Sequence, residues 1–178
     1  MFSRHSRFAL ALAAGLILAG CGNGLDTTTI ANGGIVVLGD KVTLHGAGDS
    51  DALLDATGRL VIDGHDVAVD ATQRQLLQQY YRGARAVREH GVATGKAGAA
   101  VAVQSLKKAA AHVTGSDGEQ ADAKFDTATR RVDEEANKIC LDIGQIRAAQ
   151  NRLADSLPAF KPFAGIIDGD DSDCSDNS

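Results

Sequence analysis

Two glycine-containing segments hold residue types that could bind a phosphate or attack an ester. Residues 91–96 have the sequence Gly-Val-Ala-Thr-Gly-Lys, and phosphate-binding loops use such glycines and a lysine to hold phosphate groups. That motif needs four residues between its glycines and Ser or Thr after the lysine, whereas this chain has three and then Ala97. Residues 115–118, Gly-Ser-Asp-Gly, lack the spacing of the G-x-S-x-G nucleophile elbow. Neither segment predicts a catalytic residue, and the second is more typical of a turn.

Histidines and C-terminal aspartates are the candidates for metal ligands. His45, His65, His90 and His112 lack the H-x-x-x-H spacing that places two ligands on one helix face, so each is expected at the surface. Residues 168–173 offer clustered carboxylates, but they lack the glycine and the glutamate that a calcium loop requires. We therefore expect no metal site and no cofactor, and we interpret the cluster as a solubilising tail.

Cys21 follows a segment that is typical of an export signal. Arg4 and Arg7 precede an apolar run of about 13 residues, whereas a membrane span needs about 20. The run ends in Leu18-Ala19-Gly20-Cys21, which looks like the lipobox read by lipoprotein signal peptidase. In that pattern the cysteine is lipidated and the new amino terminus is acylated, which anchors a protein stably. We expect residues 1–20 to be a lipoprotein signal peptide and Cys21 the lipidation site. The alternative is plain secretion with a free Cys21.

Two further cysteines remain if Cys21 is lipidated. Cys140 and Cys174 can then form one disulfide in an oxidising periplasm. Closing this loop would remove roughly 3 to 4 kcal/mol of unfolded-state freedom in the chain-entropy model. A redox or metal pair is the alternative, but the C-x-x-C spacing and a neighbouring histidine are missing. We predict a structural disulfide.

The elements that position these residues begin after a polar stretch. Residues 21–34 have no apolar period, which indicates a flexible tether. Short apolar runs follow and are separated by turn residues, with Gly39-Asp40 suited to a type II′ turn and Asp63-Gly64 to a type I′ turn. Residues 35–70 are therefore expected to form a small antiparallel β-meander.

Two helices are expected next. Asp70 and Gln73 form a capping-box pattern ahead of an amphipathic stripe, and Gly91 is expected to end that helix. A Gly/Ala-rich stretch follows, with a kinked or frayed start and a helix from about Ala97. A membrane-inserting glycine motif is the alternative, but its apolar run is too short to span a bilayer.

A third and longest helix is expected over residues 121–157. Apolar residues recur there at steps of three or four, and charged residues occupy the opposite side, so the helix is amphipathic, with Gly144 as the place for a bend. Pro158 ends the helical region of residues 71–157. Residues 158–178 are expected to be an acidic tail that the disulfide ties back. Together these elements predict an α+β fold.

Composition limits the classes of partner. The 178 residues carry a formal net charge of −5. Five aspartates account for most of the excess: Asp168, Asp170, Asp171, Asp173 and Asp176. The sequence lacks the basic stripe of a phosphate-backbone binder, so we expect no nucleic-acid partner. Aromatic residues make up 4% and Trp is absent, so the core is expected to rest on Ala, Val, Leu and Ile.

Residues 58–82 resemble the YggN-like family of exported bacterial proteins, in a strand, an Asp-Gly turn, a second strand and a helix with a Tyr-Tyr pair. Residues 91–98, Cys140, the Leu-Pro-Ala-Phe of residues 157–160 and the final Asp-Cys pair also resemble it. This resemblance implies a domain of unknown function, export and the same architecture, and it carries over no catalytic residue. The lipobox departs from the ordinary signal peptides of that family.

These features predict a non-enzymatic lipoprotein of the cell envelope that faces the periplasm. Gly22, where aspartate would stand in an inner-membrane lipoprotein, indicates the inner leaflet of the outer membrane by resemblance to the enterobacterial sorting rule. The expected role is structural or interactive, through an envelope protein or self-association on the long helix. A carrier of a small apolar ligand is the alternative, and a catalytic protein is third. An enclosed apolar cavity would favour the carrier, and an exposed apolar stripe on residues 121–157 would favour the partner.

Overall fold

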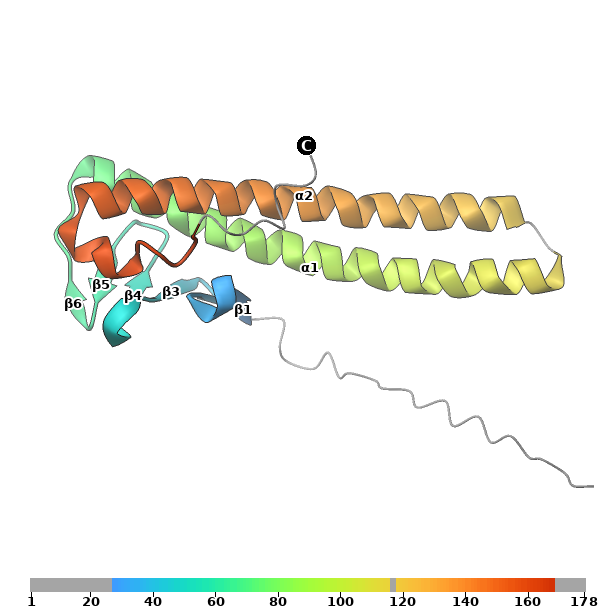
Figure 1. The fold of residues 1–178 in the computed structure, drawn as a ribbon, viewed down its shortest axis with the longest axis horizontal. Helices are drawn as coiled ribbons and strands as arrows, with labels where there is room; N and C mark the ends of the chain where they lie inside the picture. Colours follow the sequence, from blue (N-terminus) through green and yellow to red (C-terminus); the bar gives the residue numbers. More distant parts are fainter. Residues whose placement is uncertain (1–26, 116–117, 169–178) are drawn as a thin grey trace, which may run out of the picture.

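The computed structural model describes residues 27–115 and 118–168. In this part of the chain, a six-stranded sheet lies against one end of a hairpin of two long helices (Figure 1). The predicted α+β fold, with a meander followed by helices, is confirmed. The predicted signal peptide, Cys21, Cys174 and most of the acidic tail lie outside the described residues.

The strands follow one another across the sheet in sequence order, and each pairs antiparallel with the next. Their bounds are Thr27–Ile30 (β1), Ile35–Leu38 (β2), Lys41–His45 (β3), Asp51–Leu54 (β4), Leu60–Ile62 (β5) and His65–Asp66 (β6). Short 3-10 helices, η1 (Ala31–Gly33) and η2 (Ala47–Asp49), connect β1 to β2 and β3 to β4. Asp63 and Gly64 have φ angles of 48° and 81°, as the predicted type I′ turn requires.

The prediction of a flexible tether over residues 21–34 is wrong for its second half. Strand β1 begins at Thr27, pairs Thr29 with Val36 and buries Ile30 against the core. The three threonines of this segment are β-branched, which suits a strand, but they provide no alternating apolar pattern. Pairing with β2, rather than local pattern, therefore determines this strand.

A single helix, α1 (Ala71–Thr114), replaces the two helices predicted before residue 115. Asp70 and Gln73 form the predicted capping box, with each side chain accepting a hydrogen bond from the other's backbone N–H. The predicted stop at Gly91 is wrong. Gly115 ends the helix instead, at a φ of 70°, because a left-handed residue satisfies the last carbonyls. Gly91 remains helical since α1 pairs with the second helix on both sides of it, which offsets a propensity cost of about 1 kcal/mol.

The long helix predicted over residues 121–157 is confirmed as α2 (Gly118–Ser156), which is uninterrupted at Gly144. A 3-10 helix, η3 (Pro158–Phe163), follows directly. Gln150 is fully buried and holds the segment after η3, because its side-chain amide donates to the carbonyls of Ala164 and Ile167 and its oxygen accepts from the N–H of Ile167. A buried amide with all three bonds made fixes this segment on α2.

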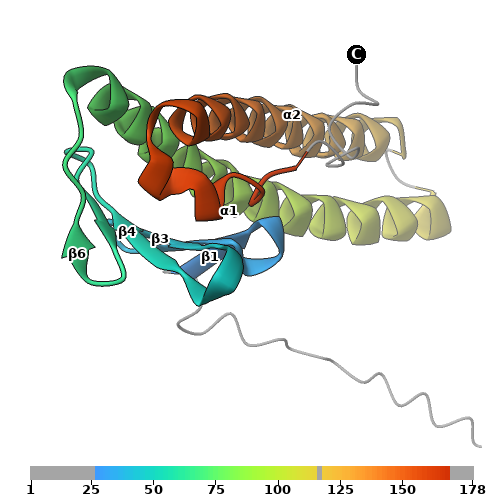
Figure 2. The same cartoon turned by 60° about the vertical axis from the view of Figure 1, so that its left-hand side comes forward.

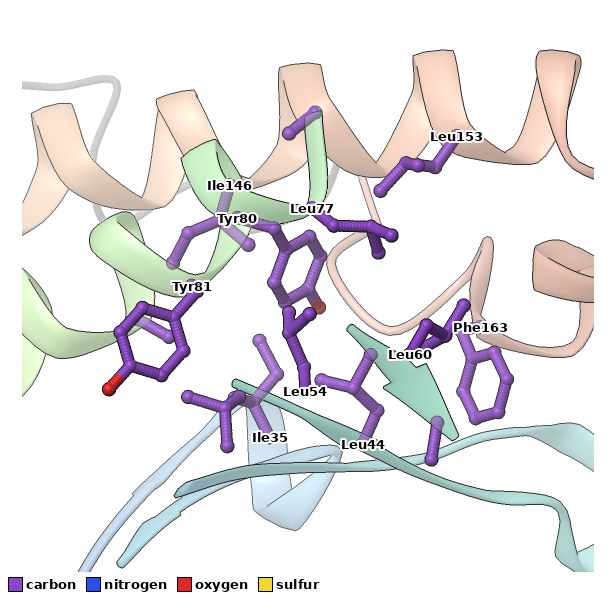
Figure 3. Close-up of a cluster of buried hydrophobic side chains, with 14 of the residues drawn as sticks. Ile35, Leu44, Leu54, Leu60, Leu77, Tyr80, Tyr81, Ile146, Leu153 and Phe163 are labelled. Atoms are coloured by element: carbon purple, nitrogen blue, oxygen red, sulfur yellow. The ribbon is translucent and has the colours of Figure 1, made fainter. Parts of the chain in front are cut away.

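The core lies between the inner face of the sheet and the sheet-proximal ends of both helices (Figures 2 and 3). The aliphatic residues predicted for it are present, but three aromatic rings lie at its centre. Tyr80 meets Phe160 edge-on at 6.1 Å, and Phe160 lies 5.5 Å from Phe163. The core therefore rests mostly on Ala, Val, Leu and Ile, as expected, and a few aromatic rings that converge on one point complete it.

The two helices cross closely above this core. A Cβ atom on Gly83 of α1 would lie 2.6 Å from Cγ1 of Ile146 on α2. Such a contact is too short for any side chain, so glycine is required here by space and not by backbone conformation.

We predict that Gly83→Ala lowers the free energy of unfolding by about 1 to 3 kcal/mol, because the added methyl group forces the helices apart. Gly91→Ala is the matched control on the same helix, since nothing lies within 4 Å of its Cβ position. It should raise stability by up to about 1 kcal/mol through helix propensity. Urea denaturation measures both, and equal effects would contradict the close crossing.

A second prediction concerns two neighbouring tyrosines. The hydroxyl of Tyr80 is buried without a hydrogen-bond partner in the described part of the chain, and this burial raises its pKa. The Tyr81 hydroxyl donates to the carbonyl of Asp40 at 2.8 Å. Tyr80→Phe should leave the free energy of unfolding unchanged or raise it by about 1 to 2 kcal/mol, whereas Tyr81→Phe should lower it by about 0.5 to 1.5 kcal/mol. The reverse order in chemical denaturation would refute this assignment.

Candidate functional site

Both helices continue far beyond the sheet, and we call this part the arm: residues 90–114 of α1 and 118–142 of α2 (Figures 1 and 2). The buried residues of α1 end at Val87, and those of α2 near the sheet begin at Ile146. Within the arm only Ala128 is buried. The arm is therefore a two-helix structure without a core of its own.

The helices of the arm meet along a seam whose positions alternate in steps of three and four, the spacing of a coiled coil. On α1 the half-buried seam residues are His90, Thr94, Ala97, Val101, Gln104, Lys108 and Ala111. On α2 they are Ala121, Phe125, Val132, Glu135, Ile139 and Asp142, together with the buried Ala128. Polar and charged residues thus occupy positions that are normally apolar in a coiled coil.

A polar cluster closes the seam next to the sheet. His90 Nδ1 lies 2.8 Å from Glu135 Oε2, and its Nε2 lies 3.7 Å from Asp142 Oδ2. Lys138 donates to the other oxygen of Glu135 at 2.7 Å. Hydrogen bonds from Lys138 and then His90 lower the pKa of Glu135, whereas burial raises the pKa of Asp142 against the opposing influence of His90.

The prediction that His90 lies at the surface is wrong, because its side chain is only 26% exposed. Its partner Glu135 is 45 residues away along the chain, and no local spacing could reveal that pair. His45, His65 and His112 are exposed as predicted. A histidine between two carboxylates is a combination that general acid–base catalysis uses. Of this cluster, Glu135 lines the groove of the arm, whereas His90 and Asp142 do not. The contacts of His90 with Glu135 and Asp142 join the two helices.

A second polar contact lies toward the tip of the arm. Lys108 Nζ lies 3.0 Å from Asp122 Oδ1 and 4.9 Å from the centre of the Phe125 ring. The ion pair with Lys108 lowers the pKa of Asp122. Together with the cluster at His90, this contact sets which residues of α1 and α2 lie opposite each other.

An open groove with a volume of about 580 Å³ runs along one side of the arm. Its floor consists of small side chains, Ala93, Ala97, Ala100 and Ala128. Charged side chains form much of its walls, among them Lys96, Lys124, Arg131 and Glu134. The carrier hypothesis requires an enclosed apolar space, and it gains no support from this groove.

Apolar side chains of the arm face solvent on the side of α1 that points away from α2. Leu106 is 74% exposed and Val113 is 87% exposed. They belong to a second series with the same alternating spacing: Val92, Gly95, Ala99, Ala102, Leu106, Ala109 and Val113. We call this series the outer face of α1. An apolar stripe on residues 121–157 was expected as the contact surface, but that stripe is turned toward α1 and the sheet.

Of the three cysteines predicted as sites, the structure describes only Cys140. Cys140 is half-buried on α2 and is disulfide-bonded. Its predicted partner Cys174 and the predicted lipidation site Cys21 lie outside the described residues, so both assignments remain predictions. Within residues 27–115 and 118–168, no group of three His, Cys, Asp or Glu side chains is arranged to hold a metal ion.

Comparison with known proteins places the chain in a family. The model of a protein of unknown function, DUF2884, matches residues 30–123, which comprise most of the sheet, all of α1 and the start of α2. The chain belongs to this family. The resemblance to the YggN-like family is thereby confirmed. No curated protein and no solved structure matches the chain. Neither α1 nor α2 is long and apolar enough over any stretch to cross a membrane.

The polar seam predicts a dependence of stability on pH. Because the folded protein lowers the pKa of Glu135, its contribution is complete above the ordinary value of 4.5 and is lost as pH falls through the lower folded value. Glu135→Gln should therefore reduce the free energy of unfolding at pH 7 and flatten its decline below pH 4.5. Glu134→Gln, at an exposed neighbouring position, is the control and should change little. Chemical denaturation across this pH range measures both; identical curves would refute the role of the cluster.

Proposed function

We propose that this chain is a non-enzymatic lipoprotein, anchored through Cys21 in the inner leaflet of the outer membrane and facing the periplasm, whose arm makes contact with a protein partner. One observation carries the contact role: the arm leaves Leu106 and Val113 exposed on its outer face, although polar residues such as His90 occupy part of its seam. An ordinary surface helix does the opposite. The lipobox pattern and membership of a family that resembles exported proteins support the location.

Burial of the exposed apolar side chains of the arm against a partner would be favourable in free energy. Complete burial of a Val or Leu side chain is worth about 1.5 to 3 kcal/mol. Val103, Leu106 and Val113 remain 49%, 74% and 87% exposed, so covering them would release much of that free energy. Contiguous apolar side chains on an otherwise charged molecule are typical of interaction surfaces.

The distance between the anchor and the fold supports a role close to the bilayer. If Cys21 carries the lipid, residues 22–26 alone separate it from β1, which begins at Thr27. Five extended residues reach at most about 17 Å. The arm itself extends about 37 Å past the sheet, at 1.5 Å per residue. An anchored chain would thus hold its sheet beside the membrane while the arm reaches for a partner.

Cross-linking in intact cells tests this proposal. The wild-type chain should form a cross-linked product, and replacing Val103, Leu106 and Val113 together by Ser should abolish it, because the apolar contact is lost. Cys21→Ala should weaken it by releasing the chain from the membrane. Leu141→Ser, at a 69% exposed position on α2, is the control and should retain the product. If the wild-type chain yields no product of any composition, the contact role is refuted.

A further inference from the structure

We infer that the partner of the arm is a second copy of this chain, which lays the outer face of its own α1 antiparallel against the same face. This inference rests on the contact role proposed above and names the occupant. It follows from three properties of the outer face: its alternation of large and small side chains, its charge, and its length.

Side-chain size is the first property. Gly95, Ala102 and Ala109 alternate along the outer face with the larger or more exposed positions. When two such faces run antiparallel, Leu106 of one copy lies level with Ala102 of the other, and Val113 lies level with Gly95. Leu106 and Val113 then each meet a small side chain, which lets the helix axes approach to about 8 Å. A parallel pair would instead place Leu106 beside Leu106 and leave the small positions unfilled.

Charge is the second property. Residues 90–114 of α1 contain Lys96, Lys107 and Lys108 and no acidic residue. In a parallel pair each lysine lies level with its own copy, and like charges at one level repel. Lys108 belongs to the seam and is paired with Asp122. In the antiparallel pair the two copies of Lys96 are about 24 Å apart along the axis and those of Lys107 about 9 Å apart, both beyond the screening length of roughly 8 Å at physiological salt. Charge therefore selects the antiparallel orientation.

Length is the third property. In the antiparallel pair, Gly115 at the tip of one copy comes level with Ala93 of the other. The last α1 residue buried against the sheet and α2 is Val87, so each tip stops before it reaches the other copy's sheet. The overlap therefore uses nearly the whole arm without a clash between the two folded bodies.

A lipid surface fits the outer face less well than a second copy does. Helices that lie in a bilayer interface depend on large anchors such as Trp, Phe and Leu and on a strongly charged opposite face. The outer face has one Leu and no aromatic residue. Its small side chains offer little area to lipid, but they allow another helix backbone to approach closely.

Sedimentation equilibrium of the full chain carrying Cys21→Ala tests the pairing without the influence of lipid. This protein should be in a monomer–dimer equilibrium at concentrations up to about 100 µM. Leu106→Lys should weaken the dimer by roughly tenfold or more, because it places a charge against Ala102. Leu141→Lys is the matched control, since Leu141 on α2 is similarly exposed, and it should leave the dimer intact. A monomeric parent protein, or equal loss in both variants, would overturn the inference. Circular dichroism checks that all three are folded.

Disulfide trapping tests the orientation. Chains carrying Gly95→Cys and chains carrying Val113→Cys, both in the Cys21→Ala background, are mixed and oxidised. Both positions are exposed, and nothing lies within 4 Å of a Cβ on Gly95. The antiparallel pair predicts mixed disulfides between the two chains. Disulfides between identical chains alone would show a parallel pair and overturn the orientation.

Two further outcomes separate this inference from the proposed function. If the parent protein is monomeric but sediments with vesicles of phosphatidylglycerol and phosphatidylethanolamine, and Leu106→Lys abolishes that binding, the face binds lipid and the inference is wrong. If the product formed in cells contains a different envelope protein and no second copy, the contact role stands while the self-pairing is wrong. If the product formed in cells contains two copies of this chain and is lost in the Leu106→Lys variant, the result supports both the contact role and the self-pairing.

Discussion

The close crossing of α1 and α2 above the sheet is the constraint on which the rest of the structure depends. Gly83 has no side chain, so Ile146 can pack against the backbone of α1. This contact brings Tyr80 and Leu153 into the same buried layer over the inner face of the sheet. Since the sheet covers only this end of the hairpin, the crossing fixes the direction in which both helices continue. The arm is positioned by its base and not by contacts of its own.

An arm without a core needs another way to keep its two helices in register. Small side chains such as Ala97 and Ala128 in the seam offer little hydrophobic stabilisation, and an alanine seam could slide by a heptad at little cost. The pairs Glu135–His90 and Asp122–Lys108 hold particular residues of α2 opposite particular residues of α1. Polar pairs inside a coiled coil commonly specify register at some expense in stability.

How much the sequence predicts depends on whether the signal is local. The capping box at Asp70, the Asp63-Gly64 turn and the apolar period of α2 are each contained within a few residues, and each was predictable. Strand β1 was not, because its threonines acquire their role only by pairing with β2. Gly91 was misinterpreted as a stop, since a glycine terminates a helix only where the chain turns left-handed, as it does at Gly115.

The apolar stripe of residues 121–157 is turned inward and not exposed, for a related reason. The apolar period of residues 121–157 is strong, but a strong period indicates burial, and α2 uses it against α1 and the sheet. The outer face of α1 has the same spacing, yet most of its positions are Gly or Ala, which weigh little in a search for apolar stripes. Sequence reasoning also placed His90 at the surface, because its partners lie on another helix. Contacts between segments distant in sequence determine which side of α1 is exposed, which side of α2 is buried, and how far His90 is buried.

Membrane anchoring would change what a modest contact surface can achieve. About 30 Å of paired helix, at 1.5 Å per residue, is at the small end of stable protein interfaces. Two chains held on one membrane by short tethers meet at a far higher effective concentration than they do in solution. If Cys21 carries the lipid, the five residues between it and β1 would keep every sheet at a similar height above the bilayer. The arms of neighbouring chains would then lie within one thin layer. Under the proposed anchoring, a face with one leucine and two valines among small side chains would then be sufficient for pairing on the membrane.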